Sequence, residues 1–182
     1  MPLWMIIAYA VISAIIIFAI VKMIKREITQ FVKISFSSII GYSLLFFVVW
    51  IFKLPIPSYI ILLTMLTSLL TCYFGYYRML YQHSRVFDRF VHAFSTFSMS
   101  LLAYSIIRIF ITVGGSRLFQ ALFVFAAGMT VGSIFELKEA YHDAKKRKEI
   151  KEQKGLRDTN MDIVFDLIGS CLSALFAYYV LI

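Results

Sequence analysis

Charged residues are scarce in this chain. Of its 182 residues only 15% are charged, whereas 61% are hydrophobic. Soluble globular domains contain about 25% charged and about 45–50% apolar residues, so the composition excludes an ordinary water-soluble enzyme or binding module. The chain is expected to be an integral membrane protein that forms one compact domain over residues 1–182, with no separate soluble domain.

Cysteine and proline are also rare. The two cysteines, Cys72 and Cys171, each fall inside an apolar segment, which is typical of packing residues rather than of a disulfide or a pair of metal ligands. None of the three prolines lies in the middle of an apolar segment, which argues against the broken helices of many carriers. No cleavable signal peptide is expected, because the first apolar run is too long and lacks a small-residue cleavage site.

The apolar runs themselves are long and continuous, which is typical of membrane helices and not of the short alternating strands of membrane barrels. The sequence predicts an all-α, polytopic helical bundle with six transmembrane helices, each close to the ~20 residues that cross a bilayer. Their expected bounds are 3–22, 34–52, 58–77, 90–112, 118–137 and 162–182. Tight turns are expected at residues 53–58 and 114–116.

The basic residues are unevenly distributed between the loops. Fifteen of the 18 Lys and Arg residues fall in the first, third and fifth loops. The positive-inside rule places these loops in the cytoplasm. The sequence therefore predicts a multi-pass protein of the cell membrane with both termini on the extracytoplasmic side.

The fifth loop, residues 138–160, is the only long one, and it is strongly basic. Its residues 144–154 are good helix formers that could extend the fifth span, with Gly155 as a C-terminal cap. We expect this loop to be solvated and to contact anionic lipid headgroups, with an acidic protein partner as the alternative. Nucleic acid is not expected as a partner, because no aromatic residues are interleaved with the charges for base stacking.

Acidic residues gather where the sixth span begins. Asp158, Asp162 and Asp166 are spaced four apart, so on a helix they share one face. Asp166 is expected to lie about one turn inside the apolar slab. An acid at that depth is costly and indicates a functional site.

Two other helix ends carry similar groups. Asp88 and His92 share a face of the fourth span, and Glu136 and Glu139 share a face at the end of the fifth. Under the predicted topology all these groups lie at one leaflet, where they need a cation: a metal ion, a shared proton, or Arg and Lys partners. The candidate metal ligands are Asp88, His92, Glu136, Glu139, Asp158, Asp162 and Asp166. Such a donor set suits a divalent Mn, Fe, Zn or Mg ion rather than copper.

Each of these residues also has an ordinary structural explanation. Thr159 to Asp162 reads as a capping box for the sixth span, and Asp88 could cap the fourth. Glu139 could pair with Lys138 or a neighbouring arginine, and His92 could be a satisfied core histidine. Asp166 and Glu136 are explained least well in this way.

Small residues predict which spans pack closely. Gly128, Gly132 and Ser133 form a small-residue face on the fifth span, and another on the sixth consists of Gly169, Ser170 and Ser173. Such faces let membrane helices approach closely. The packing is expected to bring Glu136 towards Asp166.

The polar motifs of the second half resemble those of a known group. The motifs resemble those of VanZ-like membrane proteins, and more closely those of the YjdF-like family of inner-membrane proteins. They are Asp88–His92, Phe135–Glu139, Asp158–Asp162 and Leu167–Gly169. The resemblance covers about residues 85–175 and implies a small helical protein of the cell envelope; VanZ-like proteins are associated with glycopeptide resistance. The chain departs from the pattern where Leu-Lys-Glu follows Glu136 and in its long basic fifth loop.

Three classes of function remain open from the sequence. In the first, the protein is an enzyme whose metal activates water or polarises a phosphoryl oxygen of a lipid or polyprenyl-linked substrate at the cytoplasmic leaflet. Its catalytic residues would be His92, Glu136, Asp162 and Asp166, and its phosphate-holding residues would be Arg85, Arg89 and Arg157. The alternatives are a proton-coupled transporter and a non-enzymatic subunit that docks a partner through the basic loop.

Overall fold

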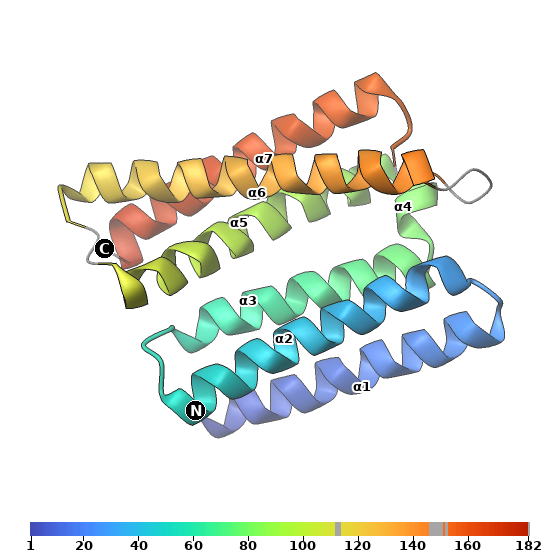
Figure 1. Cartoon of the computed structure of the whole chain (residues 1–182), viewed down its shortest axis with the longest axis horizontal. Helices are drawn as coiled ribbons and strands as arrows, with labels where there is room; N and C mark the ends of the chain where they lie inside the picture. Colours follow the sequence, from blue (N-terminus) through green and yellow to red (C-terminus); the bar gives the residue numbers. More distant parts are fainter. Residues whose placement is uncertain (112–113, 146–150, 152, 182) are drawn as a thin grey trace. The chain divides into compact units, whose positions relative to one another are not determined.

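Helices make up the computed structural model of this chain (Figure 1), which describes all residues except 112–113, 146–150, 152 and 182. The described residues contain no strand. Six helical stretches are long and apolar enough to cross a membrane: Leu3–Lys25, Thr29–Phe52, Ser58–Tyr77, Arg85–Phe110, Arg117–Ala144 and Leu156–Leu181. The predicted all-α fold with six spans is confirmed.

Two helix starts differ from the prediction. The fourth span begins at Arg85 instead of residue 90, and the sixth begins at Leu156 instead of residue 162. The polar residues at these starts extend the helices beyond their apolar cores, because tertiary context overrides the weak helix propensity of Asp, Asn and Thr.

The helix of the fifth span continues past residue 137 to Lys145, as its helix-forming loop residues predict. Gly155, predicted to end the preceding helix, instead directly precedes the last helix with a φ of +113°. Of the rest of the predicted cytoplasmic helix, residues 146–150 and 152 lie outside the described residues. Lys151, Gln153 and Lys154 are described and are not helical, so the prediction is wrong there.

The chain forms two compact units, residues 1–91 and 92–182. The first contains α1 (Leu3–Lys25), a 3₁₀ turn (Thr29–Phe31), α2 (Val32–Phe52), α3 (Ser58–Leu69), the short α4 (Leu80–His83) and the start of α5 (Arg85–Phe110). Helix α1 packs against both α2 and α3 (Figure 1). Between α1 and α2, the Tyr9 hydroxyl donates a hydrogen bond to Ser43 Oγ at 3.0 Å, and the Tyr9 ring stacks on Phe46. The Tyr9 and Ser43 hydroxyls therefore satisfy each other within this apolar contact.

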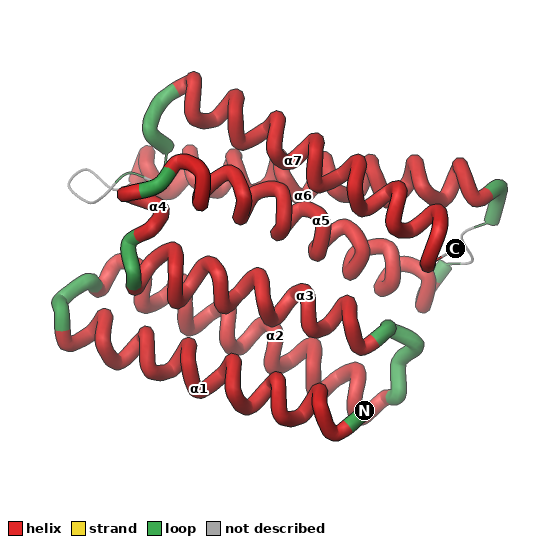
Figure 2. Tube along the Cα trace, turned by 180° about the vertical axis from the view of Figure 1, so that it is seen from behind, coloured by secondary structure: helices red, strands yellow, loops and turns green. Residues whose placement is uncertain are grey.

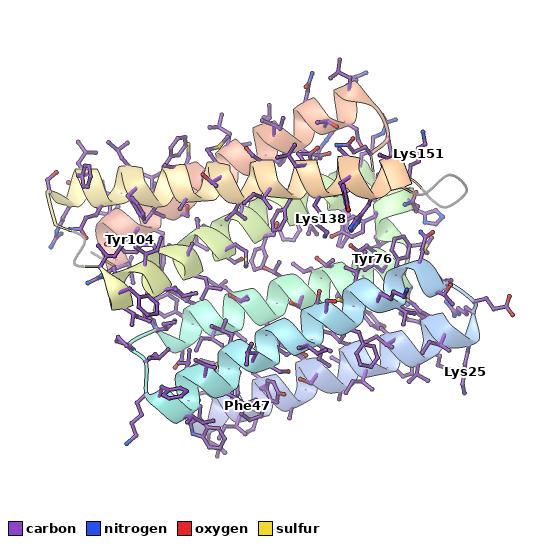
Figure 3. All side chains as sticks on the ribbon, viewed as in Figure 1. Lys25, Phe47, Tyr76, Tyr104, Lys138 and Lys151 are labelled. Carbon is purple, nitrogen blue, oxygen red and sulfur yellow. The ribbon has the colours of Figure 1, made fainter. Side chains whose placement is uncertain are left out.

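Helix α3 continues into a π-helix at Leu70–Tyr77. There the Tyr76 ring stacks on Phe31 with centroids 4.4 Å apart and planes 7° from parallel. Gly75 leaves space for the Tyr81 ring, which a Cβ atom at this position would overlap. Tyr76 and Lys25 lie towards one end of this unit, and Phe47 lies towards the other (Figure 3).

The second unit contains the rest of α5, α6 (Arg117–Lys145), α7 (Leu156–Phe176) and a short π-helix (Ala177–Leu181). Helices α6 and α7 lie side by side (Figure 2). A Cβ atom at Gly128 would lie 2.5 Å from Ser170 Oγ, and one at Gly132 would lie 2.5 Å from Asp166 Oδ2. The close packing predicted from the small residues is confirmed.

Two details of that packing differ from, or add to, the prediction. Ser133 is exposed and donates its hydroxyl to the Met129 carbonyl at 2.8 Å, so it does not belong to the α6 surface that meets α7. Gly169 on α7 lies against the backbone of Ala93 on α5, where a Cβ atom would overlap the Ala93 carbonyl oxygen. The glycines at these contacts therefore allow α7 to pack closely against both α5 and α6.

Candidate metal centre

His92 links the three helices of the second unit. Its side chain lies on α5 and is only 7% exposed. The Nδ1 atom lies 3.3 Å from Asp166 Oδ1 on α7, and Nε2 lies 3.9 Å from Glu136 Oε1 on α6. Since a carboxylate oxygen accepts, Nδ1 is the donor of the first contact when Asp166 is ionised. The ring thus directs one nitrogen at each carboxylate.

Asp166 is the most deeply buried acid of the group, at 1% exposure. Its Oδ1 also accepts a hydrogen bond of 2.6 Å from the hydroxyl of Thr96, one turn after His92 on α5. Among the described residues none donates to Oδ2, which lies against Gly132. One oxygen therefore fixes His92 and Thr96, while the other is enclosed by the α6 backbone.

Glu136 faces the same space from α6 and is 7% exposed. Its Oε2 accepts a hydrogen bond of 3.2 Å from the side-chain amide of Gln153. Its Oε1, the atom nearest His92, is buried and receives no hydrogen bond from the part of the chain that the structure describes. A buried carboxylate oxygen without a donor is costly unless a cation compensates it.

Asp162 completes the arrangement from α7, one turn before Asp166, and is 4% exposed. His92, Glu136 and Asp162 each offer one ligand atom, and these three atoms all lie within 4.8 Å of one another. In a tetrahedral site with bonds of about 2.1 Å, ligand atoms lie about 3.4 Å apart, so the side chains would close by roughly 1 Å around an ion. One imidazole nitrogen and two carboxylate oxygens suit Zn, Mn or Fe in the +2 state.

The charge of this cluster favours a cation. Glu136, Asp162 and Asp166 bring three carboxylates to one buried imidazole, and neither Glu136 nor Asp166 pairs with a Lys or Arg among the described residues. With its carboxylates ionised, the cluster stays negative even when His92 is protonated. A divalent ion would offset this charge, which is expensive to bury otherwise.

Other predicted ligands lie outside this three-atom group. Glu139 is half-buried one turn beyond Glu136, and Asp158 is half-buried in the first turn of α7, where its Oδ2 accepts the Lys154 amide hydrogen at 3.3 Å. Asp88 is buried and belongs to the first unit.

Two capping explanations are wrong. Helix α7 begins at Leu156, so Asp162 lies well inside it and cannot cap it. Helix α5 is capped by Ser84, whose Oγ accepts the Phe87 amide hydrogen at 3.1 Å, while Asp88 lies inside the helix. The positions of Asp162 and Asp88 therefore have no explanation as helix caps.

The three predicted phosphate-holding arginines do not all belong to one unit. Arg85 and Arg89 lie in the first unit, at the start of α5, whereas Arg157 is exposed in the first turn of α7. Arg157 forms no ion pair with any described residue. Nothing in the second unit places Arg157 at the three-atom group.

Sequence reasoning missed two residues of the site. Thr96 follows His92 by four residues, so the helical repeat that placed Asp88 beside His92 could also have singled it out. Gln153 lies outside any helix and gives no pattern. Its contact with Glu136 is visible only in the three-dimensional structure.

Comparison with known proteins gives the family of this chain. The chain matches no curated protein and no solved structure. Over residues 3–182 it matches the family model described as "Predicted membrane protein (DUF2238)". Six apolar helices over the same residues agree with that description. The chain therefore belongs to the DUF2238 family of multi-pass membrane proteins.

Proposed function

We propose that the second unit binds one divalent metal ion through His92, Glu136 and Asp162, and that the protein is a metal-dependent membrane enzyme. The observation that carries this proposal is the orientation of His92. Histidines that bind a metal through one nitrogen almost always donate the other N–H to a carboxylate or carbonyl. Here Nδ1 contacts Asp166 while Nε2 faces Glu136, whose Oε1 has no other donor in the described chain.

The ligand count favours catalysis over a purely structural role. Structural zinc sites are usually closed by four protein ligands, whereas catalytic sites use three and leave a position for water or substrate. A metal on these residues would activate water or polarise a phosphoryl oxygen. The chain's own contribution is to orient His92 through Asp166 and Thr96 and to exclude bulk water from a buried site.

A lipid or polyprenyl-linked substrate that carries phosphate fits the surroundings. The site lies inside membrane-spanning helices, near the end of the unit where α6 finishes and α7 begins. Lys138 lies towards this end, and Tyr104 lies towards the other (Figure 3). Exposed lysines attract phosphate, and the positive-inside rule makes this the cytoplasmic end, with both termini outside.

The resemblance to VanZ-like and YjdF-like proteins belongs to this proposal. The residues that carry it include His92, Glu136 and Asp162, which the second unit brings together. A role in the cell envelope follows from the resemblance, with a lipid-linked precursor as the substrate class. Contact of loop 138–160 with anionic lipid or an acidic partner remains a prediction.

Metal content tests the proposal directly. Protein purified in detergent without chelator is expected to contain about one Zn, Mn or Fe per chain by elemental analysis. Glu136→Gln removes one ligand charge and should lower this content strongly, whereas Glu27→Gln, at an exposed turn of the first unit, should not. Wild-type protein that contains no metal, and takes up none during dialysis against these ions, would refute it.

A proton-coupled carrier is the second candidate. The observation that favours it is the buried His92–Asp166 pair itself, because ionisable pairs inside membrane helices mark proton pathways. Proteoliposomes that acidify when a substrate gradient is imposed, and fail to do so with Asp166→Asn, would support this candidate. A metal-free wild type would favour it over the enzyme.

A further inference from the structure

Gln153 contacts the candidate site from outside the helices. Its side-chain Nε2 lies 3.2 Å from Glu136 Oε2 and 3.3 Å from the Glu136 backbone carbonyl oxygen. The two hydrogens of one amide nitrogen can serve both acceptors. Gln153 therefore donates hydrogen bonds to both the side chain and the backbone of Glu136.

A separate bond anchors Gln153. Its backbone N–H donates to Asp143 Oδ2 at 3.0 Å. Asp143 lies on α6 about two turns beyond Glu136. The backbone that carries the side-chain amide is thus anchored by a contact that does not involve the side-chain amide itself.

The hydrogen bonds from Gln153 determine which way the Glu136 carboxylate is turned. Because Oε2 is held by Gln153, the other oxygen, Oε1, is the one that faces His92 Nε2 at 3.9 Å. A freely rotating carboxylate would exchange the two oxygens, or turn both away from the imidazole. Groups that hold a ligand in this way typically change metal affinity by about 10–100-fold when removed.

We infer that Gln153 is a positioning residue for Glu136. It holds Oε2 so that Oε1 faces His92, and it thereby sets the affinity of the site for a divalent ion. The effect on affinity rests on the proposed metal site, whereas the effect on the geometry of Glu136 and His92 does not. Gln153 would influence a bound metal only through Glu136 and would itself touch neither metal nor substrate.

The substitution Gln153→Ala isolates this role. It removes the amide but keeps the backbone N–H that bonds to Asp143, so the segment stays anchored. Lys151→Ala is the matched control, since Lys151 is exposed in the same segment. Two quantities are measured in detergent: the dissociation constant for Zn²⁺ or Mn²⁺, and the ¹⁵N resonances of His92 in metal-free, histidine-labelled protein.

Three outcomes decide the matter. We expect Gln153→Ala to weaken metal binding by about 10–100-fold and to shift the His92 resonances, with Lys151→Ala unchanged in both. If wild-type protein binds no metal but the His92 resonances still shift, the positioning role stands and the metal proposal fails. If wild-type protein binds metal while Gln153→Ala changes neither quantity, the positioning role is wrong and the metal proposal stands.

Discussion

Gly169→Ala is expected to destabilise the protein more than any other single-methyl change in α7. The added Cβ would overlap the Ala93 carbonyl oxygen on α5, which is a backbone atom and cannot rotate away. Helix α7 would have to move, and overpacking of this kind costs about 1–3 kcal/mol. The gain of about 0.5–1 kcal/mol from replacing a helical glycine with alanine would not compensate for it. Thermal unfolding in detergent measures the effect as a lower melting temperature.

Gly41→Ala is the matched control for this change. It is also a glycine inside a membrane helix, but a Cβ there would meet nothing within 4 Å. Its melting temperature should equal or exceed that of the wild type, because only the gain in helix propensity remains. Equal melting temperatures for Gly169→Ala and Gly41→Ala would show that α5 and α7 are not in contact at Ala93.

Asp166→Asn is expected to cause a large functional loss. The change removes the charge that fixes the His92 ring while keeping the shape of the side chain. Metal affinity should fall by about 100-fold, the upper end of the range for groups that orient a ligand. Membrane insertion should improve, since an acid at the centre of a span costs about 2.5–3.5 kcal/mol. Metal titration and membrane fractionation measure the two effects.

The size of any accompanying loss of stability identifies the state of His92. If His92 is charged and paired with Asp166, the asparagine leaves a buried cation without its partner, and stability should fall by about 3–5 kcal/mol. Thr96→Val removes only the hydroxyl bond to Oδ1 and should have a smaller effect on both affinity and stability. Wild-type affinity and melting temperature in Asp166→Asn would mean that neither a metal site nor an ion pair depends on Asp166.

Much of the fold could be predicted because membrane helices are specified by long apolar runs. The helix ends could not, because α7 begins at Leu156, in front of charged residues that a hydropathy pattern assigns to a loop. That error produced the capping explanation of Asp162. Gly128 and Gly132 were interpreted correctly, since small residues four apart permit close approach, whereas Ser133 lies one position away on the exposed face.

Spacing along the sequence predicted most residues of the candidate site, but not the contacts that these residues make between helices. Spacing along one helix placed Asp162 beside Asp166 and Asp88 beside His92. It could not reveal that His92 turns to Asp166 on another helix, or that Asp166 Oδ2 lies against Gly132. Such contacts depend on the rotation of each helix about its own axis, which no single-helix pattern contains. Gln153 lies outside the helices, so no helical spacing could indicate its contact with Glu136.

The π-helix at Leu70–Tyr77 has a consequence for how this family varies in sequence. A π-turn accommodates one more residue than an α-turn, and each residue advances an α-helix by about 100°. Deleting one residue from this segment would restore an ordinary helix and rotate every side chain that follows. Tyr76 would then lose its stack on Phe31. A relative with a one-residue gap here should therefore carry its aromatic ring one position away.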